Sequence, residues 1–325
     1  MHTIYTDLLG RERQHATQDV DTHPRSPKLL KILYSCVVNR SFKGGPGSMT
    51  AGEARVAIIT GGAGGIGRAI ARRMLVDGHR LALLDIDGNA AGRVAETLNR
   101  EFGSNSVVGV TGDVSDPRQC ELAVSTVTNA FGHVDILVNN AGFGACHIRP
   151  DGEKNLLTLE ELTPEVWGQF FATNINGALY MIRAVLPGMK ERGWGRIINV
   201  TTSFFTMLRS MPYGATKAAL EAGSVAWAKE LDGTGITVNV VVPGGPTDTP
   251  FLKPESEMDP KKMLKPEVMG PPIAWLCTSE GDNVTGQRFI GGMWDPDKPV
   301  IEATATAGTA AGWPDLAAAT VIWPD

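Results

Sequence analysis

The sequence predicts an α/β fold with a single doubly wound parallel β-sheet of about seven strands and helices on both faces. Two observations lead to this prediction. Between residues 54 and 292, short apolar runs alternate with longer segments of helical periodicity, which is typical of parallel strands joined by crossover helices. A glycine-rich turn, Thr60–Gly67, also joins the first apolar run directly to the first helical segment. Because ligands in such sheets bind beyond the carboxyl ends of the strands, polar residues at those ends are candidates for function.

The strands are expected where apolar and β-branched residues follow one another in short runs. In chain order they are Arg55–Thr60, Arg80–Asp85, Ser106–Thr111, Ile136–Asn139, Arg196–Thr201, Thr237–Val242 and Arg288–Ile290. Between these runs apolar residues recur at helical spacing. The expected helices include Gly67–Asp77, Pro117–Phe131, Pro164–Arg192 and Tyr213–Leu231.

Composition and charge exclude several classes of protein. Of the 325 residues, 42% are hydrophobic and 20% charged, as in an ordinary globular protein. The net charge of −5 and the lack of a long basic run argue against nucleic acid as a main partner. No apolar run reaches the roughly 18 residues needed to span a bilayer. The four cysteines are scattered and form no CxxC pair, which indicates reduced thiols in a cytoplasmic protein.

Both ends of the chain differ from its centre. Residues 1–50 are polar and end in Gly44–Ser48, so we expect a poorly ordered extension, with Met49 as the functional start. A short surface-binding helix at Leu29–Val38 is the alternative. Residues 293–325 form a tail rich in Ala, Thr and Pro, in which Trp-Pro-Asp occurs twice. This tail is equally compatible with disorder and with docking of its tryptophans on the body or on a neighbouring subunit.

The turn Thr60–Gly67 reads TGGAGGIG and predicts a nucleotide site. Gly61, Gly65 and Gly67 follow a GxxxGxG spacing, and Ile66 lies between the last two. A strand that turns on glycines into a helix leaves backbone N–H groups pointing out of the helix N-terminus, where a diphosphate binds. Glycines permit the tight turn and let the phosphates approach the backbone. A flexible turn is the alternative, and the strand–turn–helix context argues against it.

The second strand ends at Asp85, which predicts the choice of cofactor. A carboxylate at this position accepts hydrogen bonds from the ribose hydroxyls of an adenosine and repels a 2′-phosphate. The glycine turn contains no Lys or Arg, and Ile86 follows Asp85. The sequence therefore predicts NAD, with NADP as the less favoured cofactor. Asp87 competes with Asp85 for this role, and either residue alternatively caps the next helix.

Tyr213 and Lys217 form a candidate catalytic pair. They stand four residues apart in a segment of helical periodicity, so both side chains share one face. A free tyrosine titrates near pH ~10, and a neighbouring ammonium is expected to lower that pKa. Tyr213 would then donate a proton to a carbonyl or accept one from an alcohol as a hydride moves. An exposed helix pair is the alternative for such a motif.

In these features the chain resembles the short-chain dehydrogenase/reductase family over about residues 54–292. The motifs that carry the resemblance are TGGAGGIG at 60–67, Asp113-Val114, Asn139-Asn140-Ala141-Gly142, Asn174, Asn199-Val200-Thr201, Tyr213 with Lys217, and Pro243-Gly244. The resemblance implies a Rossmann-type sheet, a nicotinamide cofactor and a homotetramer or homodimer. Residues 51–292 would then form the dinucleotide-binding and catalytic domain.

The resemblance also implies roles for residues that the pattern alone leaves unassigned. Around the cofactor it places Asp113 and Val114 by the adenine ring, Asn140, Ala141 and Gly142 on the adenosine ribose side, and Pro243 and Gly244 nearby. Thr249 would bond the nicotinamide carboxamide, and Asn174 would hold a water in a proton relay to the lysine. Lys217 would also hold the nicotinamide ribose.

The chain departs from the family pattern where a serine usually bonds the substrate oxygen. Here the strand end reads Asn199-Val200-Thr201-Thr202-Ser203. Counting from Asn199 puts Thr202 at the serine position, whereas chemical type favours Ser203. Side chains of successive residues in a strand point in opposite directions, so only one of the two faces the substrate unless the strand has already turned. Both stay candidates, and we favour Ser203 slightly because a loop begins there.

Further departures lie towards the C-terminus. Gly245-Pro246 adds a residue before Thr249, and Ile290 precedes the paired glycines where the family often has an Asp. The segment Phe251–Pro272 is expected to cover the substrate. The six histidines show no metal-ligand spacing, so no metal site is predicted.

The sequence therefore predicts an NAD-dependent oxidoreductase that interconverts a small secondary alcohol and a ketone. Tyr213 would be the acid/base, Lys217 would tune it, and Thr202 or Ser203 would orient the oxygen. The main alternative is a regulatory protein that senses NAD without chemistry, and the retained tyrosine and lysine argue against it. The other alternative is cofactor-independent lyase or dehalogenase chemistry, and the intact glycine turn argues against that. The substrate and the physiological direction are not identified.

Overall fold

The structure is a computed structural model that describes residues 54–103 and 105–315. The expected N-terminal extension, the helix proposed at Leu29–Val38 and the second Trp-Pro-Asp of the tail lie outside these residues.

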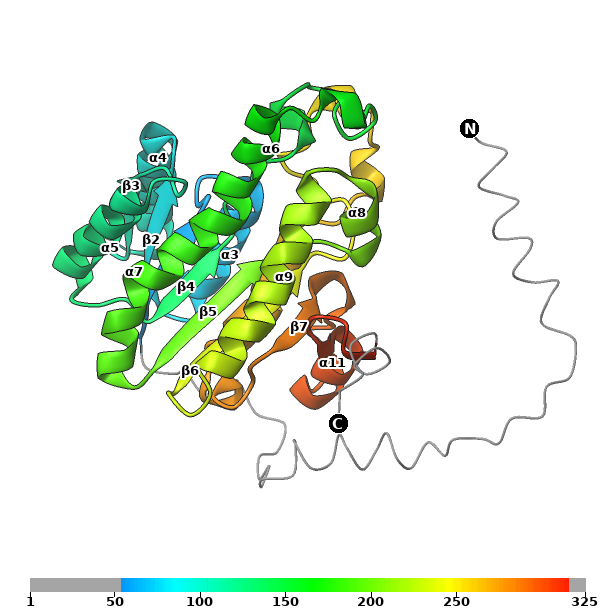
Figure 1. The fold of residues 1–325 in the computed structure, drawn as a ribbon. Coiled ribbons are helices and arrows are strands. Elements are labelled where there is room, and N and C mark those ends of the chain that lie inside the picture. The colour runs from blue at the N-terminus through cyan, green and yellow to red at the C-terminus, as the bar shows by residue number, and fades with distance from the viewer. Residues whose placement is uncertain (1–53, 104, 316–325) are drawn as a thin grey trace, which may run out of the picture. The chain divides into compact units, whose positions relative to one another are not determined.

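One mostly parallel sheet organises the described chain, with the strand order β3-β2-β1-β4-β5-β6-β7-β8 (Figure 1). Its strands are β1 (Val56–Thr60), β2 (Arg80–Asp85), β3 (Val107–Thr111), β4 (Ile136–Asn139), β5 (Gly195–Val200), β6 (Ile236–Val242), β7 (Gln287–Ile290) and β8 (Gly308–Ala310). Strands β1 to β7 pair in parallel, and β8 runs antiparallel to β7. The order reverses between β1 and β4, which is where ligands bind in sheets of this kind. The predicted fold class is confirmed.

Helices cover both faces of the sheet. They are α3 (Gly65–Val76), α4 (Gly88–Phe102), α5 (Pro117–Phe131), α6 (Pro164–Phe171), α7 (Gly177–Arg192), α8 (Phe204–Arg209), α9 (Tyr213–Glu230), α10 (Gly270–Leu276) and α11 (Val300–Ala307). Figure 1 shows α7 and α9 on one face and α3 on the other. Alternate strand residues supply the two cores: Ile59 packs with α3, α4 and α10, while Ile58 packs with α5 and α7. The helices therefore hold the carboxyl ends of the strands in fixed positions.

The expected helix Pro164–Arg192 is not uniform. A π-helical turn, Ala172–Asn176, separates α6 from α7 and contains the buried Asn174. Single π turns inside α-helices often occur at functional sites because the extra residue redirects a side chain. From this turn the side-chain amide of Asn174 contacts Phe143 in the turn after β4.

The described part of the C-terminal tail packs on the body of the protein. After α11, strand β8 pairs with β7, with Gly308 opposite Phe289. This eighth strand was not predicted, and it covers part of an edge that would otherwise expose unpaired backbone groups. The ring of Trp313 lies 5.5 Å from that of Phe204 on α8.

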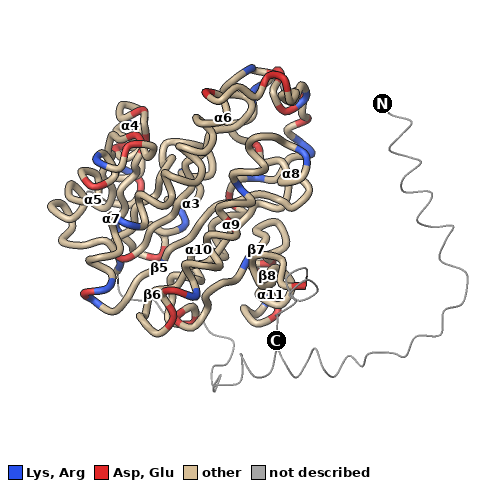
Figure 2. Tube along the Cα trace, in the orientation of Figure 1, with Lys and Arg blue, Asp and Glu red and all other residues tan. Residues whose placement is uncertain are grey.

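Charges of both signs are mixed along the described chain (Figure 2). Among the helices of residues 54–103 and 105–315, none is long and apolar enough to cross a membrane. Within the same residues, His, Cys, Asp and Glu form no group of three or more that would hold a metal ion.

Candidate functional site

The glycine turn has the geometry of a phosphate-binding loop. Helix α3 begins directly after it, and no side chain caps the helix at Gly64, so the first backbone amides of α3 stay available to a ligand. Gly61 adopts a φ of +62°, which favours glycine. A Cβ at Gly67 would collide with the carbonyl oxygen of Gly61. Ile66 packs its side chain against the core beneath the turn.

The turn after β4 is tied to the glycine turn. Thr60 Oγ1 accepts hydrogen bonds from the backbone amides of Asn140 (3.0 Å) and Ala141 (2.9 Å). The side chain of Asn140 donates in return to the carbonyls of Thr60 (2.9 Å) and Gly61 (3.2 Å). Next along the chain, Gly142 lies close to the side chains of Asn174 and Lys217. The predicted cofactor residues after β4 and the glycine turn therefore form one rim.

Asp85 faces the glycine turn, whereas Asp87 is engaged elsewhere. One carboxylate oxygen of Asp85 accepts from the amide of Ala63 (3.0 Å) and the other from the amide of Asp87 (3.1 Å). The side chain of Asp87 caps α4 by accepting from the amide of Ala90 (2.9 Å). Of the two competing carboxylates, Asp85 is the one whose position suits a ribose.

The remaining predicted cofactor residues line the same edge of the sheet. Asp113 Oδ1 accepts from the hydroxyl of Ser115 (2.7 Å), and Val114 is buried. Gly244 has a φ of +99° after β6, and the carbonyl of Pro243 accepts from the amide of Gly292 (2.9 Å).

Thr249 lies against the glycine turn at the start of α3. A Cβ added at Gly65 would approach Thr249 Cγ2 to 2.6 Å, so the two residues are in close contact. The segment after β6 therefore crosses the start of α3 and brings Thr249 against Gly65.

Lys217 is buried one turn into α9 and points towards the end of β5. Its Nζ donates a hydrogen bond to the carbonyl of Val200 (2.8 Å) and lies 5.8 Å from the centre of the Tyr213 ring. Because the ammonium is removed from water, burial lowers the pKa of Lys217 to about 8.

The pKa of Tyr213 is raised, whereas the sequence predicted that a neighbouring ammonium would lower it. Burial of the phenol raises its pKa, the charge of Glu153 adds to this rise, and a hydrogen bond with the side chain of Thr202 opposes it. Lys217 does not lower this pKa: its ammonium donates to the Val200 carbonyl, and the dominant cause of the shift is desolvation of the phenol. In this geometry Tyr213 therefore holds its proton at neutral pH.

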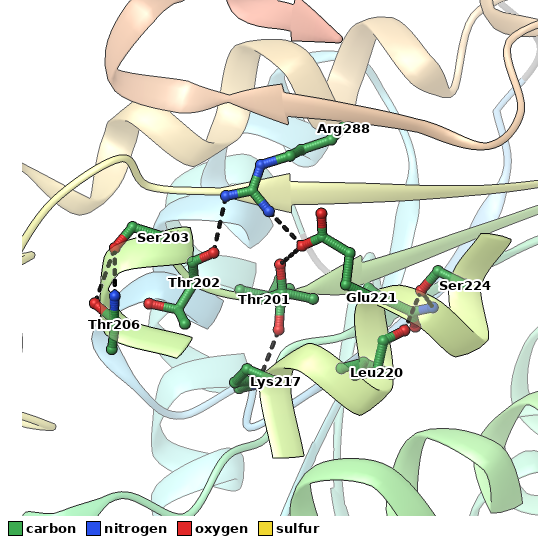
Figure 3. Close-up of polar contacts among 11 residues, drawn as sticks. Thr201, Thr202, Ser203, Thr206, Lys217, Leu220, Glu221, Ser224 and Arg288 are labelled. Atoms are coloured by element: carbon green, nitrogen blue, oxygen red, sulfur yellow. Dashed lines mark hydrogen bonds and ion pairs between the residues drawn. The ribbon is translucent and has the colours of Figure 1, made fainter. Parts of the chain in front are cut away.

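The structure separates the two candidate hydroxyls after β5. Ser203 is the N-cap of α8: its Oγ accepts from the amide of Thr206 (3.1 Å) and lies 2.9 Å from Thr206 Oγ1 (Figure 3). Thr202 instead directs its side chain to Tyr213. The strand ends at Val200 and the helix begins at Phe204, so the residue before that helix takes the capping role. This geometry favours Thr202, whereas the sequence slightly favoured Ser203.

Asn174 joins the π turn to the catalytic helix. Its Oδ1 accepts from the amide of Phe143 (2.7 Å), and its Nδ2 donates to the carbonyl of Phe143 and to Thr216 Oγ1, both at 2.9 Å. The hydroxyl of Thr216 in turn donates to the carbonyl of Tyr213 (2.7 Å). A cavity of about 10 Å³ beside Asn174, bordered by Thr60 and Asn139, has about the volume that one water requires.

A cluster of aromatic side chains lies beside the phenol. The ring of Phe251, at the start of the expected covering segment, lies 6.3 Å from Tyr213 and 5.4 Å from His147. Phe143 stacks on His147 at 4.7 Å. Gly144 lies directly against Phe251, where a Cβ would collide with the ring. The start of this segment therefore lies beside the phenol, and the separation of Phe251 from Tyr213 in the sequence gives no signal of this contact.

A family model of short chain dehydrogenases matches residues 55–260, which span the glycine turn, Asn174, Tyr213 and Lys217. The chain is a member of the short-chain dehydrogenase/reductase family. The resemblance seen in the sequence motifs is thereby confirmed.

Curated relatives and a solved structure of this family match most of their own length. A short-chain type dehydrogenase/reductase of Picea abies is 34% identical over 257 residues, which cover 74% of this chain and 92% of the relative. Acetoacetyl-CoA reductase of Cupriavidus necator is 30% identical over 245 residues, with coverages of 72% and 95%. The crystal structure of 3-ketoacyl-(acyl-carrier-protein) reductase from Brucella melitensis complexed with NADH is 29% identical, with a TM-score of 0.62 and coverages of 73% and 95%.

Proposed function

We propose that this short-chain dehydrogenase/reductase interconverts a secondary alcohol and a ketone with a nicotinamide cofactor, and that it prefers NAD to NADP. The observation that carries the proposal is the buried Lys217 beside the Tyr213 ring at the carboxyl end of β5, with the side chain of Thr202 acting on the same phenol. The proposed chemistry needs a proton donor and a second hydroxyl that contact the same substrate oxygen, and Tyr213 and Thr202 supply them.

The glycine turn, Asp85 and the rim after β4 would hold the cofactor. The uncapped N-terminus of α3 suits a diphosphate, and the carboxylate of Asp85 suits the hydroxyls of an unphosphorylated ribose. The close contacts at Gly65 and Gly67 leave no room for side chains where a phosphate approaches the backbone. When bound, a nicotinamide cofactor supplies or accepts the hydride.

Tyr213 would act as the general acid in ketone reduction. Its raised pKa keeps the phenol protonated, so it has a proton to give to the carbonyl oxygen. The hydroxyl of Thr202 would donate a hydrogen bond to the same oxygen and stabilise the negative charge that develops there. In the opposite direction the phenol would first pass its own proton to the relay through Lys217, and the phenolate would then accept the proton of the alcohol.

Lys217 and Asn174 would return a proton to the phenol. The pKa of Lys217, about 8, permits the ammonium to release and regain a proton near neutral pH. Asn174 lines the water-sized cavity, and its Oδ1 and the Lys217 Nζ both lie near Gly142. The family resemblance implies that Asn174 orients a water in this relay.

The surroundings of the phenol indicate the substrate class only broadly. Phe143 and Phe251 give this region an apolar wall, which suits a carbonyl flanked by carbon chains. Two of the relatives are named as reductases of 3-oxoacyl-(acyl-carrier-protein) and of acetoacetyl-CoA, so these compounds are suitable first members of a panel. A cytoplasmic location and a homo-oligomeric state remain predictions from the sequence and the family.

Turnover on a panel of ketones and secondary alcohols, followed by NADH absorbance, tests the proposal. We expect oxidation or reduction of at least one class, with a higher kcat/KM for NAD(H) than for NADP(H). Tight NADH binding without turnover on any of these compounds would instead favour the cofactor-sensing alternative.

A further inference from the structure

A buried ion pair lies behind the chain segment that carries Thr202. Glu221 is fully buried on α9, one helical turn beyond Lys217, and Arg288 is 9% exposed on β7. Neither residue takes part in the proton transfer proposed above. A buried ion pair is weak evidence for stability, because the loss of hydration of both charges offsets much of their attraction. This pair therefore calls for a reason other than stability.

The pair forms hydrogen bonds with two successive residues just after β5, Thr201 and Thr202 (Figure 3). One guanidinium nitrogen of Arg288 bonds Glu221 Oε2, and the other donates to the main-chain carbonyl of Thr202 at 2.8 Å. The hydroxyl of Thr201 donates to the same Glu221 oxygen at 2.9 Å. The other carboxylate oxygen, Oε1, has no hydrogen-bond partner among the described residues. The contacts of the pair are thus directed at the strand end.

The guanidinium reaches beyond the regular hydrogen bonds of the sheet. In the sheet register Arg288 lies opposite Val240 of β6, which in turn lies opposite Asn199 of β5. The contact to Thr202 therefore runs across β6 to a residue beyond the end of β5. Since the strand ladder does not hold Thr202, the guanidinium fixes its main chain instead.

We infer that Arg288, oriented by Glu221, is a positioning residue that holds Thr202 so that its hydroxyl faces Tyr213. The planar fork of arginine serves a carboxylate and a carbonyl at once, which the single ammonium of a lysine does not reproduce. Without this hold the side chain of Thr202 is free to turn away from the phenol, and small displacements of such groups reduce turnover strongly. The kinetic part of this inference rests on the proposed function, whereas its structural part does not.

The test compares R288K with R196K as a matched control. Arg196 is also a buried arginine, paired with Asp282 and bonded to the carbonyl of Leu276. It lies on β5 near the end of that strand opposite to Thr202. Three quantities are measured for each variant: kcat, the dissociation constant of NADH, and hydrogen exchange of the segment 200–206.

We expect R288K to reduce kcat by about 10²-fold without changing the NADH dissociation constant, and to speed exchange in segment 200–206. R196K should leave all three quantities near those of the parent protein. In the T202V background R288K should cause little further loss of kcat, because the group that it positions is already absent. If R288K fails to fold, the double variant E221L/R288M, which replaces the pair by apolar side chains, serves in its place.

Two results would overturn the inference. One is an unchanged exchange rate in segment 200–206 in R288K, and the other is losses of kcat that multiply when R288K and T202V are combined. If the parent protein binds NADH but turns over no member of the panel, the proposed function fails. The exchange measurement then still decides whether Arg288 holds the strand end.

Discussion

The side chain of Thr202 interacts with the phenol of Tyr213 and opposes the rise of its pKa. The hydroxyl of the next residue, Ser203, instead caps helix α8. Two adjacent hydroxyls thus have separate tasks, because the strand ends and a new helix begins within this short segment. The difference leads to opposite expectations for two neighbouring substitutions.

Thr202→Val is expected to reduce kcat by about 10²-fold, since the substrate oxygen loses one of its two hydrogen-bond partners. Thr202→Ser, which keeps the hydroxyl, should retain most of the activity. Ser203→Ala should leave kcat within a few fold and lower the free energy of unfolding by about 1 kcal/mol through loss of the cap. Steady-state kinetics and thermal unfolding of the three variants measure these effects. A kcat loss that is larger in Ser203→Ala than in Thr202→Val would assign the substrate-orienting hydroxyl to Ser203 instead.

Asp85→Ser is expected to shift cofactor preference towards NADP. The substitution removes the hydrogen bonds of a carboxylate to the ribose and its repulsion of a 2′-phosphate, which changes the ratio of kcat/KM values by about tenfold or more. The matched control is Asp87→Ser, which weakens the cap of α4 but should keep the preference for NAD. A parent protein that already prefers NADP would contradict the role given to Asp85.

Lys217 should make NADH binding depend on pH. Its pKa in the folded protein is lowered to about 8 by burial, so the ammonium loses its proton as the pH rises through about 8. If the charged form holds the nicotinamide ribose, affinity for NADH is highest below this pH and falls above it. Fluorescence titrations between pH 6.5 and 9.5 measure the effect. In Lys217→Met the affinity should be lower and nearly constant over this range, and an unchanged pH profile in that variant would exclude Lys217 as its origin.

Gly67→Ala is expected to disrupt the nucleotide site. The added methyl group would collide with the carbonyl of Gly61, so the glycine turn must shift, and NADH affinity should fall by about tenfold or more. Gly92→Ala is the matched control in the interior of α4, where a Cβ meets no atom of the described residues within 4 Å. That change should stabilise the protein by up to about 1 kcal/mol through helix propensity and leave NADH binding intact.

The sequence predicted the seven parallel strands because buried parallel strands appear as continuous apolar runs. Strand β8 was missed, since Gly308–Ala310 has no apolar run and is extended only through its pairing with β7. The π turn was missed for a similar reason. Its geometry depends on contacts of Asn174 with Phe143 and Thr216, which are distant in the chain.

Within the site, residues at fixed local spacing were predictable and long-range partners were not. The glycines, Tyr213 and Lys217 are recognisable because each set lies on one turn or one helix face. The choice between Thr202 and Ser203 depends on where β5 ends, which hydropathy does not resolve to one residue. The contact between Glu221 and Arg288 spans 67 residues of sequence. An arginine within a predicted buried strand was its only signal.

The central claim is that the phenol of Tyr213 transfers the proton to the substrate oxygen. The most direct measurement is the kcat of Tyr213→Phe on a ketone that the parent protein reduces, together with the dissociation constant of NADH. We predict that kcat falls by at least about 10²-fold while NADH binding is retained, because only the proton donor is lost. A kcat equal to that of the parent protein would contradict the account.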